Sequence, residues 1–400
     1  MAGDEVAEPF CFGFRLSFGV DSDDRFGVGL AQVYPSFFEV DLDSVDGGDF
    51  FVLEGLGHLG EDAVNIHFGS ELHFVFRHVV SGVGLSQVGA FDVFFGQLGK
   101  EECGADDVIV SLDADTYVNP GYLHSIAENF AQNPSISAVA VPYYHKLDPA
   151  DERMGRAMLR SELYMRNYAI NLLKINSPYG FTALGSAIAM RASALRKIGN
   201  VTPLQSGEDF YLVQKFCKMG GLSLFNTECV YPAGRYSDRV PFGTGPAIRR
   251  GAQGVWESYP IYHRSCFSPI REAYLLLPDL YRNRVSGKNN DFLAFLQKDG
   301  TKRDVWDDIR HNVTDFDHFV KAFHQKADGL RILQYVRTKY RQNTFNEEIA
   351  LYENMRDWLP DPCPAWFVPG KSLDSYTLEQ VDSLRDLLFD MEQQCRERYH

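Results

Sequence analysis

The chain has 400 residues, of which 45% are hydrophobic, and a formal net charge of −15. This length and composition are typical of a globular protein of two or three domains and exclude a fibrous or wholly disordered chain. The acidity argues against nucleic acid as a partner, because phosphate backbones are bound by clustered Lys and Arg.

Neither a membrane anchor nor an export signal is visible in the sequence. No apolar stretch approaches the roughly 18 residues of a membrane span, and the start, MAGDEVAEPF, lacks the basic and apolar regions of a signal peptide. The seven cysteines are odd in number and show no C-x-x-C spacing, which argues against a disulfide framework and a zinc ribbon. We therefore expect a cytoplasmic protein with reduced thiols.

The first segment, residues 1–104, has an unusual composition. Residues 1–99 hold fifteen of the thirty Phe, sixteen of the 34 Gly and sixteen Asp or Glu, but no Lys. Apolar pieces such as FFVL and LHFVF predict short strands, which Gly and Asp interrupt. Two hypotheses stay open: a β-rich, Gly-punctuated accessory segment, or a gene-model artefact that is poorly ordered.

Strand and helix signals alternate in the second segment, residues 105–250. This alternation predicts an α/β architecture with a mostly parallel sheet flanked by helices, and ligands collect at the carboxyl ends of strands in such sheets. The expected strands are 106–113, 136–141 and 185–190, and the expected helices are 120–134, 149–175 and 192–199, the last ending at Gly199.

The third segment, residues 251–400, is helical in pattern. Apolar residues recur three and four positions apart in 291–298, 315–342 and 375–399. We expect a helical C-terminal region that covers the acceptor side of a site or docks peripherally on a membrane surface.

An Asp-x-Asp pattern occurs four times, at 21/23, 41/43, 113/115 and 315/317. Only Asp113 and Asp115 end an apolar strand, where carboxylates would face a ligand crevice. Two carboxylates one residue apart suit a hard cation, Mg²⁺ or Mn²⁺, which also takes diphosphate oxygens. The alternative is an ordinary turn at the end of a strand.

Two further features allow both a structural and a functional interpretation. Glu208 and Asp209 follow Ser206, so Ser206 and Asp209 could form a capping box, although a carboxylate fixed at a helix start also suits a general base. A basic stretch places Arg235, Arg239, Arg249 and Arg250 around Gly243 and Gly245. Guanidinium groups and exposed backbone N–H groups of this kind stabilise a diphosphate.

In this order, the stretches VSLDADTYVNPGYL, GSAIAMRASALRKIGN and GEDFYLVQKFCKMGG resemble the catalytic half of family 2 glycosyltransferases, inverting enzymes of the GT-A fold. The continuation into RVPFGTG resembles a bacterial soluble subgroup, and the resemblance covers residues 105–250. It implies a nucleotide-sugar donor and a hydroxyl acceptor on a glycan, a lipid-linked group or another molecule.

The resemblance also implies a role for each site residue. Asp113 and Asp115 would hold the metal ion that bridges the donor diphosphate. Asp209 would be the general base toward the acceptor, with Glu208 beside it, and Gly185 and Ser186 would line the acceptor pocket. The residues implied to cover the leaving diphosphate are Arg239, Gly243, Gly245 and Arg249.

Residues 1–104 depart from the family pattern, because no strand–helix–strand unit for the nucleotide can be named there. Two alternatives therefore stay open, a transferase without activity and a non-catalytic scaffold. A third alternative is a haloacid-dehalogenase-like phosphohydrolase, since VIVSLDADTYV also places an Asp-x-Asp pair directly after an apolar strand. Asp113 would then be the nucleophile, Asp115 the acid and base, and Mg²⁺ would again be needed.

Overall fold

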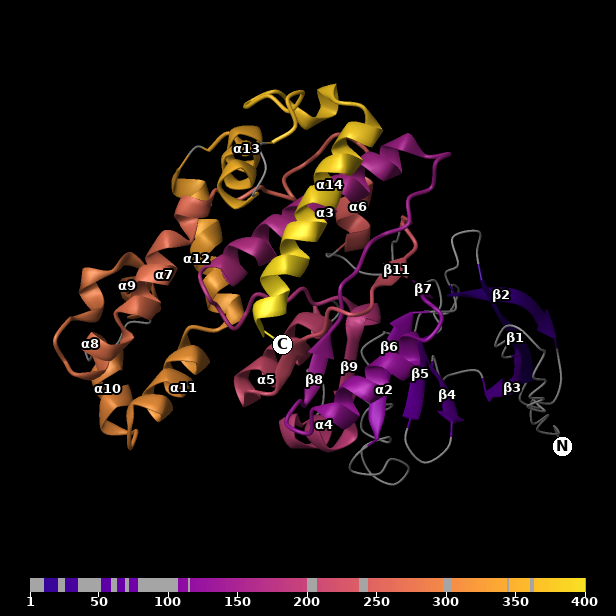
Figure 1. Ribbon diagram of the computed structural model, residues 1–400, viewed down its shortest axis with the longest axis horizontal. Coiled ribbons are helices and arrows are strands. Elements are labelled where there is room, and N and C mark those ends of the chain that lie inside the picture. The colour runs from indigo at the N-terminus through magenta and orange to yellow at the C-terminus, as the bar shows by residue number, and fades with distance from the viewer. Residues whose placement is uncertain are drawn as a thin grey trace, which may run out of the picture. The chain divides into compact units, whose positions relative to one another are not determined.

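The computed structural model describes residues 107–113, 116–199, 207–236, 244–297, 304–343, 345–359 and 363–399, together with the backbone of five strands before residue 78. The chain is a mixed α/β protein with two compact units (Figure 1). Unit 1 comprises Met1–Lys146, Ala183–Asp209 and Phe225–Ala233, and unit 2 comprises Leu147–Thr182, Phe210–Leu224 and Gly234–His400.

One sheet of unit 1 has the strand order β11-β7-β2-β1-β3, and all of its pairings are antiparallel. Its strands are β1 (Cys11–Val20), β2 (Phe26–Tyr34), β3 (Val52–His58), β7 (Thr116–Val118) and β11 (Val230–Pro232). The strand β7 therefore brings the residues directly after Asp115 into this sheet.

The strands that unit 1 contributes to a second sheet are ordered β8-β9-β6-β5-β4. They are β4 (Ala63–Phe68), β5 (Leu72–Arg77), β6 (Val108–Asp113), β8 (Ala138–Ala140) and β9 (Ile188–Arg191). Only the β5–β6 pairing is parallel, because β9 runs against both β6 and β8, and β4 runs against β5. This part of the sheet is mixed, where the sequence predicts a mostly parallel one.

Two helices of unit 1, α2 (Tyr122–Gln132) and α4 (Ala192–Ile198), lie close to their predicted positions. The 3₁₀ turn η1 (Gly185–Ala187) occupies the first half of the segment 185–190, which the sequence predicts as a strand. Ile126 and Phe130 of α2 are buried, as the helical spacing predicts. Gly199 ends α4 with a φ of 72°, a left-handed conformation that glycine adopts without strain.

A single arginine ties α2 to β9. The Arg191 guanidinium donates hydrogen bonds to the carbonyls of Ile136 at 2.9 Å and Phe130 at 2.5 Å, and it lies over the Phe130 ring. Arg191 therefore holds the end of the helix against the strand that follows the predicted acceptor residues.

The described residues of unit 2 form helices and one short strand, β10 (Leu222–Leu224). Its main helices are α3 (Glu152–Lys174), α6 (Thr244–Gly251), α7 (Ser268–Leu275), α8 (Leu277–Tyr281), α9 (Asp291–Gln297), α10 (Val305–His311), α11 (Phe316–Lys326), α12 (Gly329–Gln342), α13 (Glu347–Trp358) and α14 (Leu378–Arg396). The short 3₁₀ turns are η2 (Arg264–Cys266), η3 (Gly287–Asn289), η4 (Leu373–Ser375) and η5 (Glu397–Tyr399). The helix α5 (Glu208–Met219) begins in unit 1 and continues in unit 2.

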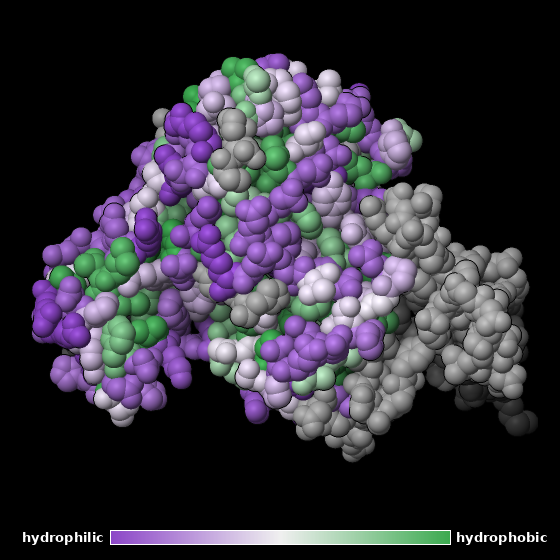
Figure 2. Space-filling model, viewed as in Figure 1, coloured by the Kyte–Doolittle hydropathy of each residue, from purple (hydrophilic) through white to green (hydrophobic). Residues whose placement is uncertain are grey.

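The long helix α3 is the centre of unit 2. Asp151 caps its start, since its carboxylate accepts a hydrogen bond from the Met154 N–H at 2.9 Å. One face packs on α6, where Met158, Ile248 and Tyr259 belong to one buried cluster. Another face packs on α14, which lies beside α3 in Figure 1. Mainly hydrophilic residues cover the outward side of α14 (Figure 2), as expected of an amphipathic helix.

Ionised side chains are buried between α3 and α14. Arg166 is fully buried and contacts Glu162 at 2.5 Å and Glu392 at 2.7 Å, and its guanidinium lies over the Phe389 ring. Arg385 lies 3.4 Å from Glu162, and Arg396 lies 3.7 Å from Glu392. We refer to Glu162, Arg166, Arg385, Glu392 and Arg396 as the buried charge network. Because each buried charge has a partner of opposite sign, the network replaces the solvation that burial removes.

The apolar pattern over residues 315–342 forms two helices, α11 and α12. The break falls at Asp328, whose side chain accepts a hydrogen bond from the Arg331 N–H at 3.0 Å and so caps α12. None of the helices in the described part of the chain combines the length and the apolar character that a membrane crossing needs.

Candidate active site

The strand β6 carries Asp113, one of the two predicted metal-binding aspartates, to an edge of the sheet. Val108, Ile109, Val110 and Leu112 are all buried, so β6 is the strand covered on both faces that the sequence predicts. Asp113 is its last residue and pairs with Arg77 of β5 in the backbone register. The Asp113 side chain and the whole of Asp115 lie outside the described residues.

The predicted acceptor residues lie at the same edge. In the antiparallel β6–β9 pair, Ser111 stands opposite Ile188. Because β9 runs opposite to β6, the turn Gly185–Ala187 that precedes it lies beside the carboxyl end of β6. The structure therefore brings Gly185 and Ser186 to the strand end that carries Asp113.

A buried hydrogen bond joins these two parts of the site. The Thr116 hydroxyl donates to the Ser186 hydroxyl at 2.9 Å, and both residues are only 1% exposed. Thr116 directly follows Asp115, so this bond anchors the end of the acidic stretch to the turn before β9. The Asp-x-Asp pattern does not include Thr116, although its hydroxyl directly follows the pair in the sequence.

Main-chain hydrogen bonds also fix the Gly185–Ala187 turn. The Val141 N–H donates to the Ala187 carbonyl at 2.8 Å, and the Ala187 N–H donates to the Leu184 carbonyl at 2.8 Å. A turn fixed by main-chain and side-chain bonds presents its groups in one geometry, as a binding site requires.

A second polar cluster follows β7. The Ser125 hydroxyl donates to a Glu228 carboxylate oxygen at 2.8 Å, and the Asn119 amide reaches its other oxygen at 3.5 Å. Burial, together with the Glu228 charge, raises the pKa of Tyr122 far above its ordinary value, so the phenol stays protonated. No motif in the sequence indicates Glu228, because its partners lie about one hundred positions away.

The predicted base lies at a helix start, as expected. Glu208 and Asp209 are half-buried in the first turn of α5 and belong to unit 1. A carboxylate is stabilised there by the exposed N–H groups and the helix dipole. Gly207, which precedes α5, has a φ of 83°. Ser206, the other member of the predicted capping box, lies outside the described residues.

The diphosphate residues are only partly described. Arg239 and Gly243 lie outside the described residues. Gly245 and Arg249 belong to unit 2, and the basic stretch is the helix α6 from Thr244 onward. Gly245 is the second residue of α6, and Arg249 lies in its last turn. The apolar side of α6 packs on α3, which stabilises a helix in this segment.

The residues that could hold a metal ion are Asp113 and Asp115. Their carboxylates are hard oxygen donors one residue apart at a strand end, which fits Mg²⁺ or Mn²⁺. Among the side chains that the structure describes, no group of three or more His, Cys, Asp or Glu could bind a metal ion.

No protein-family model matches the chain, and no curated protein is significantly similar to it.

Proposed function

We propose that the chain is an inverting glycosyltransferase of the GT-A type, which transfers a sugar from a nucleotide diphosphate to an acceptor hydroxyl. The observation that carries the proposal is the shared edge of the second sheet in unit 1. There the end of β6, which carries Asp113, lies beside the Gly185–Ala187 turn, and the Thr116–Ser186 hydrogen bond joins the two.

Each residue has a chemical role in this proposal. Asp209 accepts the proton of the acceptor hydroxyl as its oxygen attacks the anomeric carbon from the face opposite the diphosphate. The Gly185–Ser186 turn positions that hydroxyl. A Mg²⁺ or Mn²⁺ ion held by Asp113 and Asp115 would offset the charge of the departing nucleoside diphosphate.

The experiment has two steps. Thermal-shift screening of the full chain against nucleotide sugars, with and without Mn²⁺, first identifies the donor. Release of the nucleoside diphosphate is then measured with mixed saccharide acceptors. Asp209→Asn is expected to lower turnover about 10²- to 10⁴-fold and to leave donor binding nearly unchanged. Asp115→Asn is expected to abolish the Mn²⁺-dependent shift.

Asp317→Asn is the matched control. Asp317 belongs to another Asp-x-Asp pair but is exposed on the first turn of α11, so its variant should behave like the original chain. Normal turnover by Asp209→Asn would refute the assigned base. Release of inorganic phosphate from a small phosphomonoester, with loss of that activity in Asp113→Asn, would instead identify the phosphohydrolase.

A further inference from the structure

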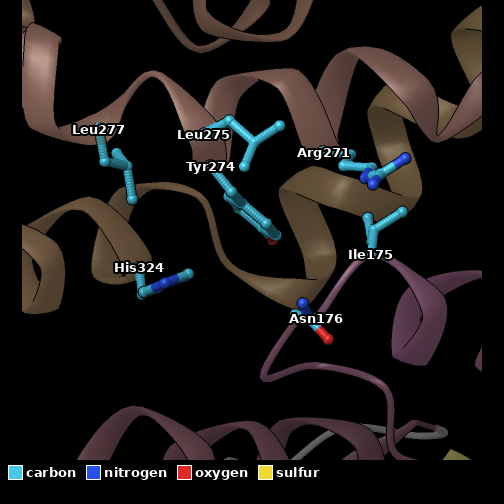
Figure 3. A pocket seen from close by; sticks show the side chains of 7 residues that line it. All are labelled: Ile175, Asn176, Arg271, Tyr274, Leu275, Leu277 and His324. Atoms are coloured by element: carbon cyan, nitrogen blue, oxygen red, sulfur yellow. The ribbon is translucent and has the colours of Figure 1, made fainter.

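A cavity of about 210 Å³ opens in unit 2, among the ends of three helical segments (Figure 3). Its walls come from the residues after α3, from α7 and the start of α8, and from α11. The lining residues are Ile175, Asn176, Arg271, Tyr274, Leu275, Leu277 and His324. The volume is below the roughly 300–1,000 Å³ of pockets for drug-sized ligands, so the cavity suits a small molecule.

The two ends of the cavity differ in chemistry. In Figure 3, Arg271 and Asn176 lie toward one end and Leu277 and His324 toward the other, with Tyr274 between them. Arg271 is the one charged lining residue besides the titratable His324, and its guanidinium makes no ion pair with any residue that the structure describes. The Asn176 amide likewise donates to no described group.

Contacts that do not involve the Arg271 guanidinium or the Asn176 amide hold the cavity walls in place. The Tyr274 hydroxyl is 3.1 Å from the Ser177 hydroxyl, and the Tyr274 ring meets the His324 ring edge-to-face. The Tyr179 hydroxyl donates to the His324 carbonyl at 2.5 Å. The cavity is therefore pre-formed, with donors at one end that are available to a ligand.

The His324 ring adds no positive charge to the cavity near neutral pH. Burial lowers the pKa of His324 to about 4, so the imidazole is neutral there. The apolar end can thus bind the hydrocarbon part of a ligand, and among the lining residues Arg271 alone supplies a positive charge for an anionic group.

We infer that this cavity binds a small organic carboxylate, with the carboxylate at Arg271 and Asn176 and an apolar or aromatic body along Tyr274 toward Leu277. A guanidinium matches a carboxylate with two parallel hydrogen bonds. The ring and the leucine side chain exclude water from the ligand body. This inference is independent of the proposed transferase activity, because all seven lining residues belong to unit 2.

The test is ligand-observed ¹⁹F NMR with 4-fluorobenzoate on the full chain, with neutral 4-fluorobenzamide as the matched probe. We expect the benzoate to bind at millimolar concentration and the benzamide to bind at least about tenfold more weakly. Arg271→Met should weaken benzoate binding by a similar factor. Arg282→Met removes an equally exposed charge outside the cavity and should leave binding unchanged.

A second variant tests the role of the Asn176 side-chain amide. Asn176 has a φ of 57°, so Asn176→Gly keeps the backbone conformation and removes only the side chain. It should weaken benzoate binding without unfolding the chain. The inference is overturned if the benzoate does not bind, if the benzamide binds equally well, or if Arg271→Met leaves binding unchanged. Competition by inorganic phosphate at equal concentration would also overturn it, because a simple anion site makes no use of the apolar walls.

Discussion

Arg166 offers the sharpest test of the packing in unit 2. Its guanidinium is fully buried on α3 and is shared by the carboxylates of Glu162 and Glu392 at 2.5 and 2.7 Å. Arg166→Met keeps an apolar side chain of similar length and removes the guanidinium that lies over the Phe389 ring between two buried carboxylates. The variant tests whether these ionised groups hold α3 and α14 together.

The expected loss of stability in Arg166→Met depends on the ion pairs that the two carboxylates keep. Removing one partner of a buried ion pair costs about 3–5 kcal/mol, because the other charge is left without compensation. Here Glu162 keeps Arg385 at 3.4 Å and Glu392 keeps Arg396 at 3.7 Å, so we expect the lower end, about 3 kcal/mol. In a unit of this size that corresponds to a fall in melting temperature of roughly 6–12 °C.

The assay is thermal unfolding followed by intrinsic fluorescence, with far-ultraviolet circular dichroism to confirm that the variants are folded. Arg166→Lys should be intermediate, because an ammonium group is a point charge that cannot span both carboxylates as a guanidinium does. Arg153→Met, an exposed position on the same helix, should stay within about 0.5 kcal/mol of the original chain.

A double variant decides whether the groups interact. Arg166→Met with Glu392→Gln removes one of the carboxylates that Arg166 compensates, so it should be more stable than the sum of the two single changes predicts. Strict additivity, or a melting temperature within about 2 °C of the original for Arg166→Met, would refute the argument.

Three further predictions concern single positions. Thr116→Val removes the buried hydroxyl that donates to Ser186, so it should lower the free energy of unfolding by about 1–3 kcal/mol in thermal melts. The pKa of His324 is about 4 in the folded chain and ordinary in the unfolded one. The unfolded chain therefore binds the extra proton between about pH 6.5 and 4, and stability measured across this range should fall with acidification. Gly287→Ala places a methyl group 2.3 Å from the Trp306 indole nitrogen, which should cost about 1–3 kcal/mol in denaturant unfolding.

Each of these predictions has a matched control. Thr116→Ser keeps the hydroxyl and should retain most of the stability that Thr116→Val loses. His324→Phe cannot be protonated, so its stability should depend less on pH in the same range, and an unchanged slope would refute the role of His324. Gly155→Ala, near the start of α3, meets only Leu378 at 3.4 Å and should stabilise the chain by about 0.5–1 kcal/mol. A loss equal to that of Gly287→Ala would contradict the steric argument.

Local elements of the second segment could be predicted from the sequence because their signals are local. The buried run at 108–112, the helical spacing in 122–132 and the glycine after 198 each depend on residues within a few positions. The break between α11 and α12 also has a local cause, the Asp328 cap, but the continuous apolar periodicity on both sides of it hides the signal.

The buried charge network could not be predicted in this way. Glu162 and Arg166 stand four positions apart on α3, which is the usual spacing of an exposed ion pair on a helix surface. Their burial depends on Glu392 and Arg385, more than two hundred positions away. Ionised residues are rarely fully buried, so composition alone places them at the surface.

The candidate site depends most on the direction of one short strand. With β9 antiparallel to β6, the Gly185–Ala187 turn lies at the edge where Asp113 ends β6. A parallel β9, as a mostly parallel sheet would have it, would put that turn at the opposite edge, about 20 Å away for a strand of six residues. The apolar run at 188–190 predicts a strand, but a hydrophobic pattern does not indicate whether that strand runs parallel or antiparallel to its neighbour. The Thr116–Ser186 bond can form only with the antiparallel direction, so the loss of stability in Thr116→Val also tests the strand direction on which the proposed acceptor site depends.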